Sequence, residues 1–149
     1  MVSRKIELEN IGKVCELYLQ EENLNYNELK KAKYINKAKK VYKKMLKHGS
    51  YTAACFTENQ ELMAVVNVNK ILDYYPRYEK KPYIHLETLI VKKEYQNQGV
   101  ATYLLRCVKE NLEKEGYTYI IAQSKNPYVR KILKRIGLKE TEGFTLDTI

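Results

Sequence analysis

Apolar side chains recur at helical spacing in two long segments of the chain. Between Leu29 and Leu46 they return every three or four residues, with lysines on the other side, and Gly49 follows. Between Val100 and Leu112 the same spacing recurs, and Gly116 follows. This spacing puts the apolar residues on one face of a helix, and glycine commonly ends a helix. The pattern therefore predicts two amphipathic helices.

Shorter segments rich in apolar and β-branched residues predict strands between and around these helices. The expected strands are Arg4–Leu8, Tyr51–Phe56, Leu62–Asn69, Tyr83–Val91 and Tyr117–Ala122, with a closing hairpin over Leu138–Ile149 that turns at Gly143. Further helices are expected from Asn10 to Tyr18 and over Tyr128–Ile136, and a loop over Tyr74–Pro82. The order β-α-α-β-β-β-α-β-α-β-β predicts a mixed sheet with helices, in the α/β or α+β class. No linker or repeat interrupts it, so a single domain over residues 1–149 is expected.

The charge of the chain is concentrated in one predicted helix. The 149 residues carry a formal net charge of +9, and nine lysines against one glutamate between Glu28 and His48 give that segment +8. Such a face is commonly solvated, and it can also attract an acidic partner. Arginine and aromatic residues are not interleaved here as in RNA-binding surfaces, so nucleic acid is not expected as a partner.

The cysteines and the apolar segments indicate the cellular compartment of the protein and whether it spans a membrane. Cys15, Cys55 and Cys107 are odd in number and widely spaced, and no Cys/His pairing suggests a metal site. No segment approaches the roughly 20 apolar residues of a membrane span, and the charged segment Met1–Asn10 lacks the apolar run of a signal peptide. We expect a cytoplasmic protein with reduced thiols, no metal and no membrane association.

One predicted strand leads through a polar loop directly into the second amphipathic helix. The loop reads Gln96-Asn97-Gln98-Gly99-Val100-Ala101-Thr102. Backbone N–H groups at a helix N-terminus are unpaired, and the helix dipole adds positive charge there, so phosphate groups bind well at such junctions. Gly99 and Ala101 would keep side chains away from an anion. Taken alone, the loop is consistent with a plain helix start or with a phosphate site, and it lacks the GK[ST] of ATP-binding loops.

A second motif lies downstream, where Asn126–Leu138 begins with asparagine and ends in Gly137-Leu138. Together the two motifs resemble the GNAT superfamily of N-acetyltransferases. The loop of that family reads Gln or Arg, two residues, Gly, one residue, then Gly or Ala after the fourth strand, and Gln96, Gly99 and Ala101 match it. The resemblance covers nearly all of the chain. It implies the GNAT fold, a mixed, mostly antiparallel sheet of six or seven strands, splayed at strands 4 and 5 and flanked by about four helices.

The resemblance also implies that acetyl-coenzyme A (acetyl-CoA) is the cosubstrate. The cofactor-binding residues carried over by position are Leu89, Ile90, Val91, Gln96, Asn97, Gln98, Gly99, Val100, Ala101, Thr102, Asn126 and Lys131. The loop would hold the pyrophosphate, the fourth-strand backbone would pair with the pantetheine arm, and Asn126 would contact that arm near its sulfur. Lys131 would meet the phosphates of the adenosine end.

Acetyl transfer to an amine favours a general base, because a free primary amine with a pKa near 10 is protonated at neutral pH. Alternation along the strand predicts one shared face for Tyr83, His85, Glu87, Leu89 and Val91. Glu87 and His85 are therefore the candidate catalytic residues. Glu87 would act as base or as anchor for the ammonium group, and His85 would act as base. The sequence leaves the choice between them open.

The chain departs from the family pattern at Leu133, where many GNAT enzymes carry a tyrosine that protonates the departing thiolate. The predicted function is acetyl transfer from acetyl-CoA to a primary amine of a small molecule or peptide, by direct attack, in a monomer or homodimer. Two alternatives remain open. One is a non-catalytic acyl-CoA-binding regulatory module, and the other is a basic acetyltransferase associated with RNA or tRNA.

Overall fold

The structure is a computed structural model that describes residues 1–71, 83–117, 119–124, 126–140 and 145–148. The predicted loop over Tyr74–Pro82 and the predicted turn at Gly143 lie outside these residues. Within them, the predicted order of helices and strands is confirmed.

The bounds of the elements follow the sequence pattern closely in the middle of the chain. The strands are β1 (Val2–Lys5), β2 (Tyr51–Phe56), β3 (Leu62–Ile71), β4 (Tyr83–Val91), β5 (Ile120–Gln123), β6 (Lys139–Glu140) and β7 (Thr145–Thr148). The helices are α1 (Ile11–Glu21), α2 (Glu28–Lys47), α3 (Val100–Lys114) and α4 (Pro127–Arg135), with short 3₁₀ turns η1 (Leu8–Asn10) and η2 (Lys93–Tyr95). β1 begins at Val2, and it ends at Lys5 rather than Leu8 because η1 takes up the residues just before α1.

The strands form one seven-stranded sheet in the order β1-β2-β3-β4-β5-β7-β6. Neighbouring strands are antiparallel except β4 and β5, which run parallel. The predicted mixed, mostly antiparallel sheet is thus confirmed. β4 pairs with β5 only over Ile84–Leu86, and in the described part of the chain the rest of β4, Glu87–Val91, has no partner on that side. The two strands therefore part at Leu86, as the predicted splay requires.

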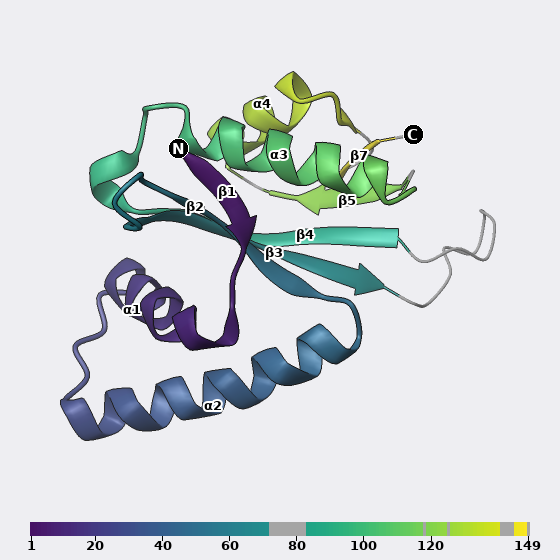
Figure 1. The fold of residues 1–149 in the computed structure, drawn as a ribbon. Coiled ribbons are helices and arrows are strands. Elements are labelled where there is room, and N and C mark those ends of the chain that lie inside the picture. The colour runs from purple at the N-terminus through teal and green to yellow at the C-terminus, as the bar shows by residue number, and fades with distance from the viewer. Residues whose placement is uncertain (72–82, 118, 125, 141–144, 149) are drawn as a thin grey trace.

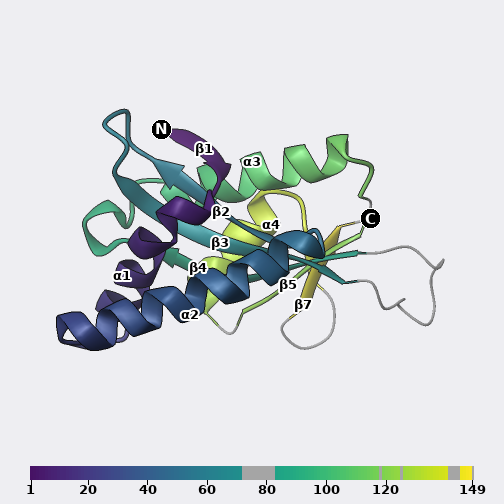
Figure 2. The same cartoon turned by 60° about the horizontal axis from the view of Figure 1, so that its bottom comes forward.

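Helices cover both faces of the sheet (Figure 1), and each face has its own core. The α3–α4 core joins these helices to the sheet and includes Val66, Ile84, Leu104, Leu105, Val108, Ile120 and Leu133. The α1–α2 core lies on the other face and includes Ile6, Val14, Cys15, Tyr42, Phe56 and Val65. Figure 2 shows α2 crossing the α1–α2 face along most of its width. The sheet therefore separates two packed layers.

Helix α2 has a well-defined start and end. The side chain of Asn27 accepts a hydrogen bond at 2.8 Å from the backbone N–H of Lys30, which satisfies one unpaired donor of the first turn. After its last residue the chain turns at Gly49, whose φ is +85°. None of the described helices is both long and apolar enough to cross a membrane.

Strand β4 contains a β-bulge next to the point where it leaves β5. Opposite the single residue Val66 of β3, it places two residues, Thr88 and Leu89. Thr88 has a φ of 54°, in the left-handed region that β-branched residues rarely adopt. A bulge of this kind shifts the alternation of side chains by one residue.

The bulge corrects the prediction that five side chains of β4 share one face. Leu89 and Val91 pack against the α3–α4 core together with Ile84 and Leu86. Glu87 precedes the bulge and alternates with Leu86, so it lies on the α1–α2 face with His85. Regular alternation, on which the prediction rested, is interrupted at Thr88. One strand thus serves both faces of the sheet.

Candidate active site

The loop between η2 and α3 presents a row of backbone N–H groups. In the described residues, the N–H groups of residues 97–102 have no hydrogen-bond acceptor in the protein. Asn97 and Gly99 both have positive φ, 60° and 79°. Alternation of left-handed and ordinary backbone makes neighbouring N–H groups converge on an anion, and the N-terminus of α3 adds its dipole. The loop can therefore bind a phosphate group through its backbone.

A cleft of about 230 Å³ opens at this loop and runs toward the free part of β4. Its walls include ten of the predicted cofactor-binding residues, namely Leu89, Ile90, Val91, Gln96, Asn97, Gly99, Val100, Ala101, Thr102 and Asn126. A second cavity of about 230 Å³ shares Leu89 and Val129 with the cleft and extends to Glu87. Together they form a path from the N–H row to Glu87, along the edge of β4 that β5 leaves open.

Glu87 is held by two neighbours on the α1–α2 face of the sheet. One carboxylate oxygen lies 2.7 Å from Nδ1 of His85, and the other accepts a hydrogen bond at 2.9 Å from Nδ2 of Asn69. The side chain of Glu87 is 45% exposed and that of His85 is 22% exposed. The two candidate bases therefore form one hydrogen-bonded pair, and Glu87 is the member that lines the path between β4 and β5.

The family assignment follows from a comparison of sequences. The Acetyltransferase (GNAT) family matches the chain over residues 13–138, which includes the loop, β4 and α4. The chain belongs to the GNAT acetyltransferase family. Enzymes of this family transfer acyl groups and in general use acetyl-CoA as cosubstrate. A comparison with curated proteins finds no match.

Solved GNAT structures share the fold at low sequence identity. An acetyltransferase from Trypanosoma brucei is 14% identical, with a TM-score of 0.75 over 95% of this chain and 94% of that one. Glucosamine-6-phosphate N-acetyltransferase from Arabidopsis thaliana is 11% identical, with a TM-score of 0.73 over 95% and 93%. Aminoglycoside 6'-N-acetyltransferase from Acinetobacter haemolyticus is 17% identical, with a TM-score of 0.67 over 96% and 94%. The GNAT fold implied by the sequence motifs is therefore confirmed.

Two residues carried over from the GNAT pattern do not line the cleft. The side chain of Gln98 donates to the backbone carbonyl of Glu94 at 3.0 Å and so braces the loop. Lys131 is exposed on α4, outside the residues that surround the cleft. The backbone of Gln98 still contributes its N–H to the open row.

Two other positions of the GNAT pattern have clear structural surroundings. Asn126 caps α4, because its side-chain oxygen accepts from the N–H of Tyr128 at 2.9 Å. Leu133 is 2% exposed and lines the inner cavity beside Glu87. The site of the family's tyrosine is therefore apolar here, and Tyr128, which is 53% exposed, lines the outer cleft one turn earlier on α4.

The structure adds cleft residues that the sequence reasoning did not select. They are Tyr95 in η2, and Val129 and Ile132 on α4. The cleft also reaches Glu21 at the end of α1. The α4 pair is spaced by three residues, so it shares a helix face, and this spacing could have predicted it. Glu21 lies far from the loop in sequence, and no local spacing links the two.

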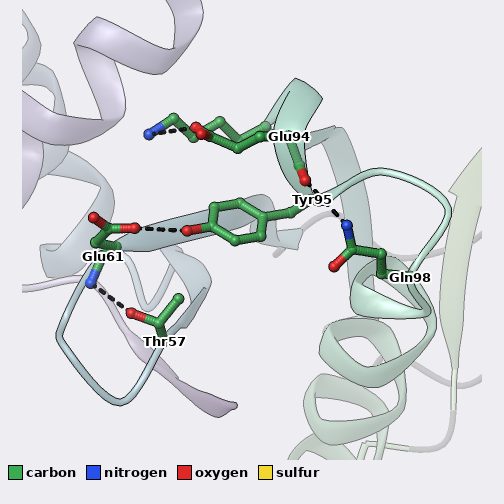
Figure 3. Close-up of polar contacts among 6 residues, drawn as sticks. Thr57, Glu61, Glu94, Tyr95 and Gln98 are labelled. Atoms are coloured by element: carbon green, nitrogen blue, oxygen red, sulfur yellow. Dashed lines mark hydrogen bonds and ion pairs between the residues drawn. The ribbon is translucent and has the colours of Figure 1, made fainter.

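Tyr95 connects the loop between η2 and α3 to the turn between β2 and β3 (Figure 3). Its hydroxyl donates to Glu61 at 2.6 Å, while the backbone N–H of Glu61 donates to the hydroxyl of Thr57 at 3.1 Å. The hydrogen bond to Glu61 raises the pKa of Tyr95 to about 12, so the phenol stays protonated and keeps donating at neutral pH. The loop is thus tied to the β2–β3 hairpin.

Proposed function

We propose that the protein is an N-acetyltransferase that moves the acetyl group of acetyl-CoA directly to a primary amine. The observation that supports it most is that two cavities with shared walls extend from the row of open N–H groups to Glu87. The N–H groups at one end can bind a pyrophosphate, and Glu87 at the other end can attract an amine. The free edge of β4 lies between the two ends. The proposed setting is the cytoplasm, as a monomer or homodimer.

Acetyl-CoA would lie along the parted strands with its pyrophosphate at residues 97–102. The loop offers backbone donors and a helix dipole, and both suit a doubly charged group. The apolar side chains of Leu89, Val91 and Val129 would flank the pantetheine arm, whose amides can pair with the open edge of β4 as an added strand does. This arrangement would bring the thioester toward Glu87.

The acceptor amine would be bound and deprotonated by the pair of Glu87 and His85. The carboxylate attracts the ammonium group, and a proton moves from the amine nitrogen to the pair. The neutral nitrogen attacks the thioester carbonyl, a C–N bond forms, the C–S bond breaks, and coenzyme A departs as thiolate. The nitrogen then releases its second proton, which passes to the thiolate and gives a neutral amide and a thiol. Asn69 and His85 fix the carboxylate through both oxygens, so its position is set before the amine arrives.

The departing thiolate takes its proton without help from position 133. Leu133 has no proton to give and is buried against the inner cavity. A thiolate is a moderately good leaving group, since thiols have pKa values of about 8 to 9, so transfer can proceed without a dedicated acid. The same leucine would also suit a binding module that holds acyl-CoA without transfer, and the assay below separates the two functions.

A transfer assay tests the proposal. The full chain is incubated with acetyl-CoA and a panel of primary amines, and the release of free coenzyme A thiol is followed together with the acetylated product. We expect thiol release that depends on the amine and matches the product one to one. Tight binding of acetyl-CoA with no transfer to any amine would support the regulatory module instead.

Replacing Tyr95 with phenylalanine is expected to weaken binding of acetyl-CoA by about three- to tenfold, the loss typical of one hydrogen bond. The substitution removes the tie between Tyr95 and Glu61 but leaves every cleft wall in place. Titration calorimetry measures the affinity. Glu58→Gln, an exposed residue of the same β2–β3 turn, is the control and should bind like the native protein. Equal affinities for Tyr95→Phe and the control would show that the tie does not position the loop.

A further inference from the structure

A third cavity lies between α1 and α2, above the α1–α2 face of the sheet, and has a volume of about 390 Å³. Its walls come from both helices and include Val14, Cys15, Ala38 and Met45, and its floor is formed by Thr52 and Asn67. Ligand sites in proteins commonly have volumes of about 300 to 1,000 Å³. The cavity is large enough for a ring-sized group.

The polar side chains at the floor of this cavity are already paired within the protein. The hydroxyl of Thr52 donates to the side-chain oxygen of Asn67 at 2.8 Å. Tyr42 donates to the backbone carbonyl of Ile6 at 2.7 Å and accepts from the N–H of Thr52 at 3.2 Å. Burial raises the pKa of Tyr18, so this wall residue stays neutral. With its floor already satisfied, the cavity favours an apolar occupant over one that brings several polar groups.

The floor of the cavity adjoins the candidate base. Asn67 of β3 pairs directly with Glu87 of β4, and residues paired in this way have Cβ atoms about 4.5 to 5.5 Å apart on the same face. Asn69, one pair further along, donates to the same carboxylate. An amine bound at Glu87 would therefore direct its substituent along the sheet toward Asn67 and into the cavity.

We propose that the acceptor is a small primary amine whose nitrogen is attached to an apolar, ring-sized group, and that this group occupies the cavity between α1 and α2. The proposal rests on the function proposed above. The charge of α2 argues in the same direction, because Lys37 lines the cavity and the helix carries nine lysines against one glutamate. Polycationic acceptors would be repelled there.

The first test compares aliphatic amines of similar basicity that differ in the group attached to the nitrogen. The acceptors are 2-phenylethylamine, ethylamine and spermidine, and both binding and transfer are measured. Burial of a phenyl ring predicts a kcat/KM for 2-phenylethylamine about 100-fold above that for ethylamine, with spermidine no better than ethylamine. A ratio near one, or a preference for spermidine, would overturn the proposal.

The second test fills the cavity from α2. Ala38→Phe should raise the KM for 2-phenylethylamine at least about tenfold and leave the KM values for ethylamine and acetyl-CoA unchanged, and Ala38→Leu should have a smaller effect in the same direction. Ala32→Phe is the matched control, because Ala32 is an exposed residue of the same helix that does not line the cavity. Equal effects at positions 32 and 38 would contradict the assignment. Thermal unfolding shows whether each variant is folded. If Ala38→Phe does not fold, the result for Ala38→Leu decides the test.

Calorimetric titration of 2-phenylethylamine keeps the two proposals apart. If the amine binds the native chain, and Ala38→Leu weakens that binding while no amine is acetylated, the transfer function fails and the cavity assignment stands. If ethylamine is acetylated but 2-phenylethylamine neither binds nor reacts better, the function stands and the cavity assignment fails.

Discussion

Replacing Gly99 with valine is expected to lower the affinity for acetyl-CoA at least about 100-fold. Gly99 has a φ of +79°, and a Cβ at this position would meet no protein atom within 4 Å. The added side chain would therefore project into the space before the open N–H groups, where the pyrophosphate is proposed to lie. It would displace the anion and remove several charge-assisted hydrogen bonds at once. Titration calorimetry with coenzyme A and acetyl-CoA measures the loss.

The same substitution at Gly116 separates this effect from backbone strain. Gly116 has a φ of +93°, and a Cβ there would also meet no protein atom within 4 Å, but it lies beyond the far end of α3. Valine costs about 1 to 2 kcal/mol in left-handed backbone, so both variants should lose similar stability. Only Gly99→Val should lose the ligand. Native affinity in Gly99→Val, or equal losses in both variants, would exclude the loop as the pyrophosphate site.

Replacing Glu87 with glutamine is expected to lower kcat by about 100- to 10,000-fold, the range for removing a general base. Glutamine keeps the size of the side chain and an oxygen that can accept from His85 or Asn69, but it carries no charge and takes no proton. Binding of acetyl-CoA should stay unchanged, because Glu87 lies beyond the cleft that holds the loop residues. Steady-state transfer and calorimetry on the same preparation give both values.

Two further variants show how the effect of Glu87→Gln arises. Glu58→Gln changes an exposed carboxylate in the β2–β3 turn by the same chemistry and should leave kcat as in the native protein. Asn69→Ala removes one of the two partners of the carboxylate and should lower kcat more mildly, by about tenfold. If Glu87→Gln keeps at least half of the native kcat, Glu87 is not the base and positioning alone accounts for transfer.

Local sequence signals predicted those parts of the fold that depend on neighbours in the chain. The helix after Asn27 and the strands over Tyr51–Phe56 and Tyr83–Val91 lie where the apolar spacing placed them. The segment from Gln96 to Thr102 leads into α3 as predicted, because its glycine and its position after a strand are local features. In such segments the pattern and the packing agree, since each apolar face has one layer to cover.

The parts that could not be predicted depend on pairing between distant segments. The bulge at Thr88 exists because Val66 faces two residues of β4, and no feature of Thr88 itself predicts it. It moved Leu89 to the other face and so separated it from Glu87. The contact of Glu21 with the cleft and the tie between Tyr95 and Glu61 likewise join residues from different parts of the chain. Alternation and spacing describe one segment at a time and cannot show such contacts.

The two cores on opposite faces of the sheet have an evolutionary consequence. The proposed cosubstrate cleft belongs mainly to the α3–α4 layer, while the proposed acceptor cavity belongs to the α1–α2 layer. Substitutions at distant sites without shared partners act nearly independently, so mutations in one layer should leave the other largely unaffected. A duplicated gene can therefore acquire a new acceptor through changes in α1 and α2 while the acyl transfer of the GNAT family is inherited intact.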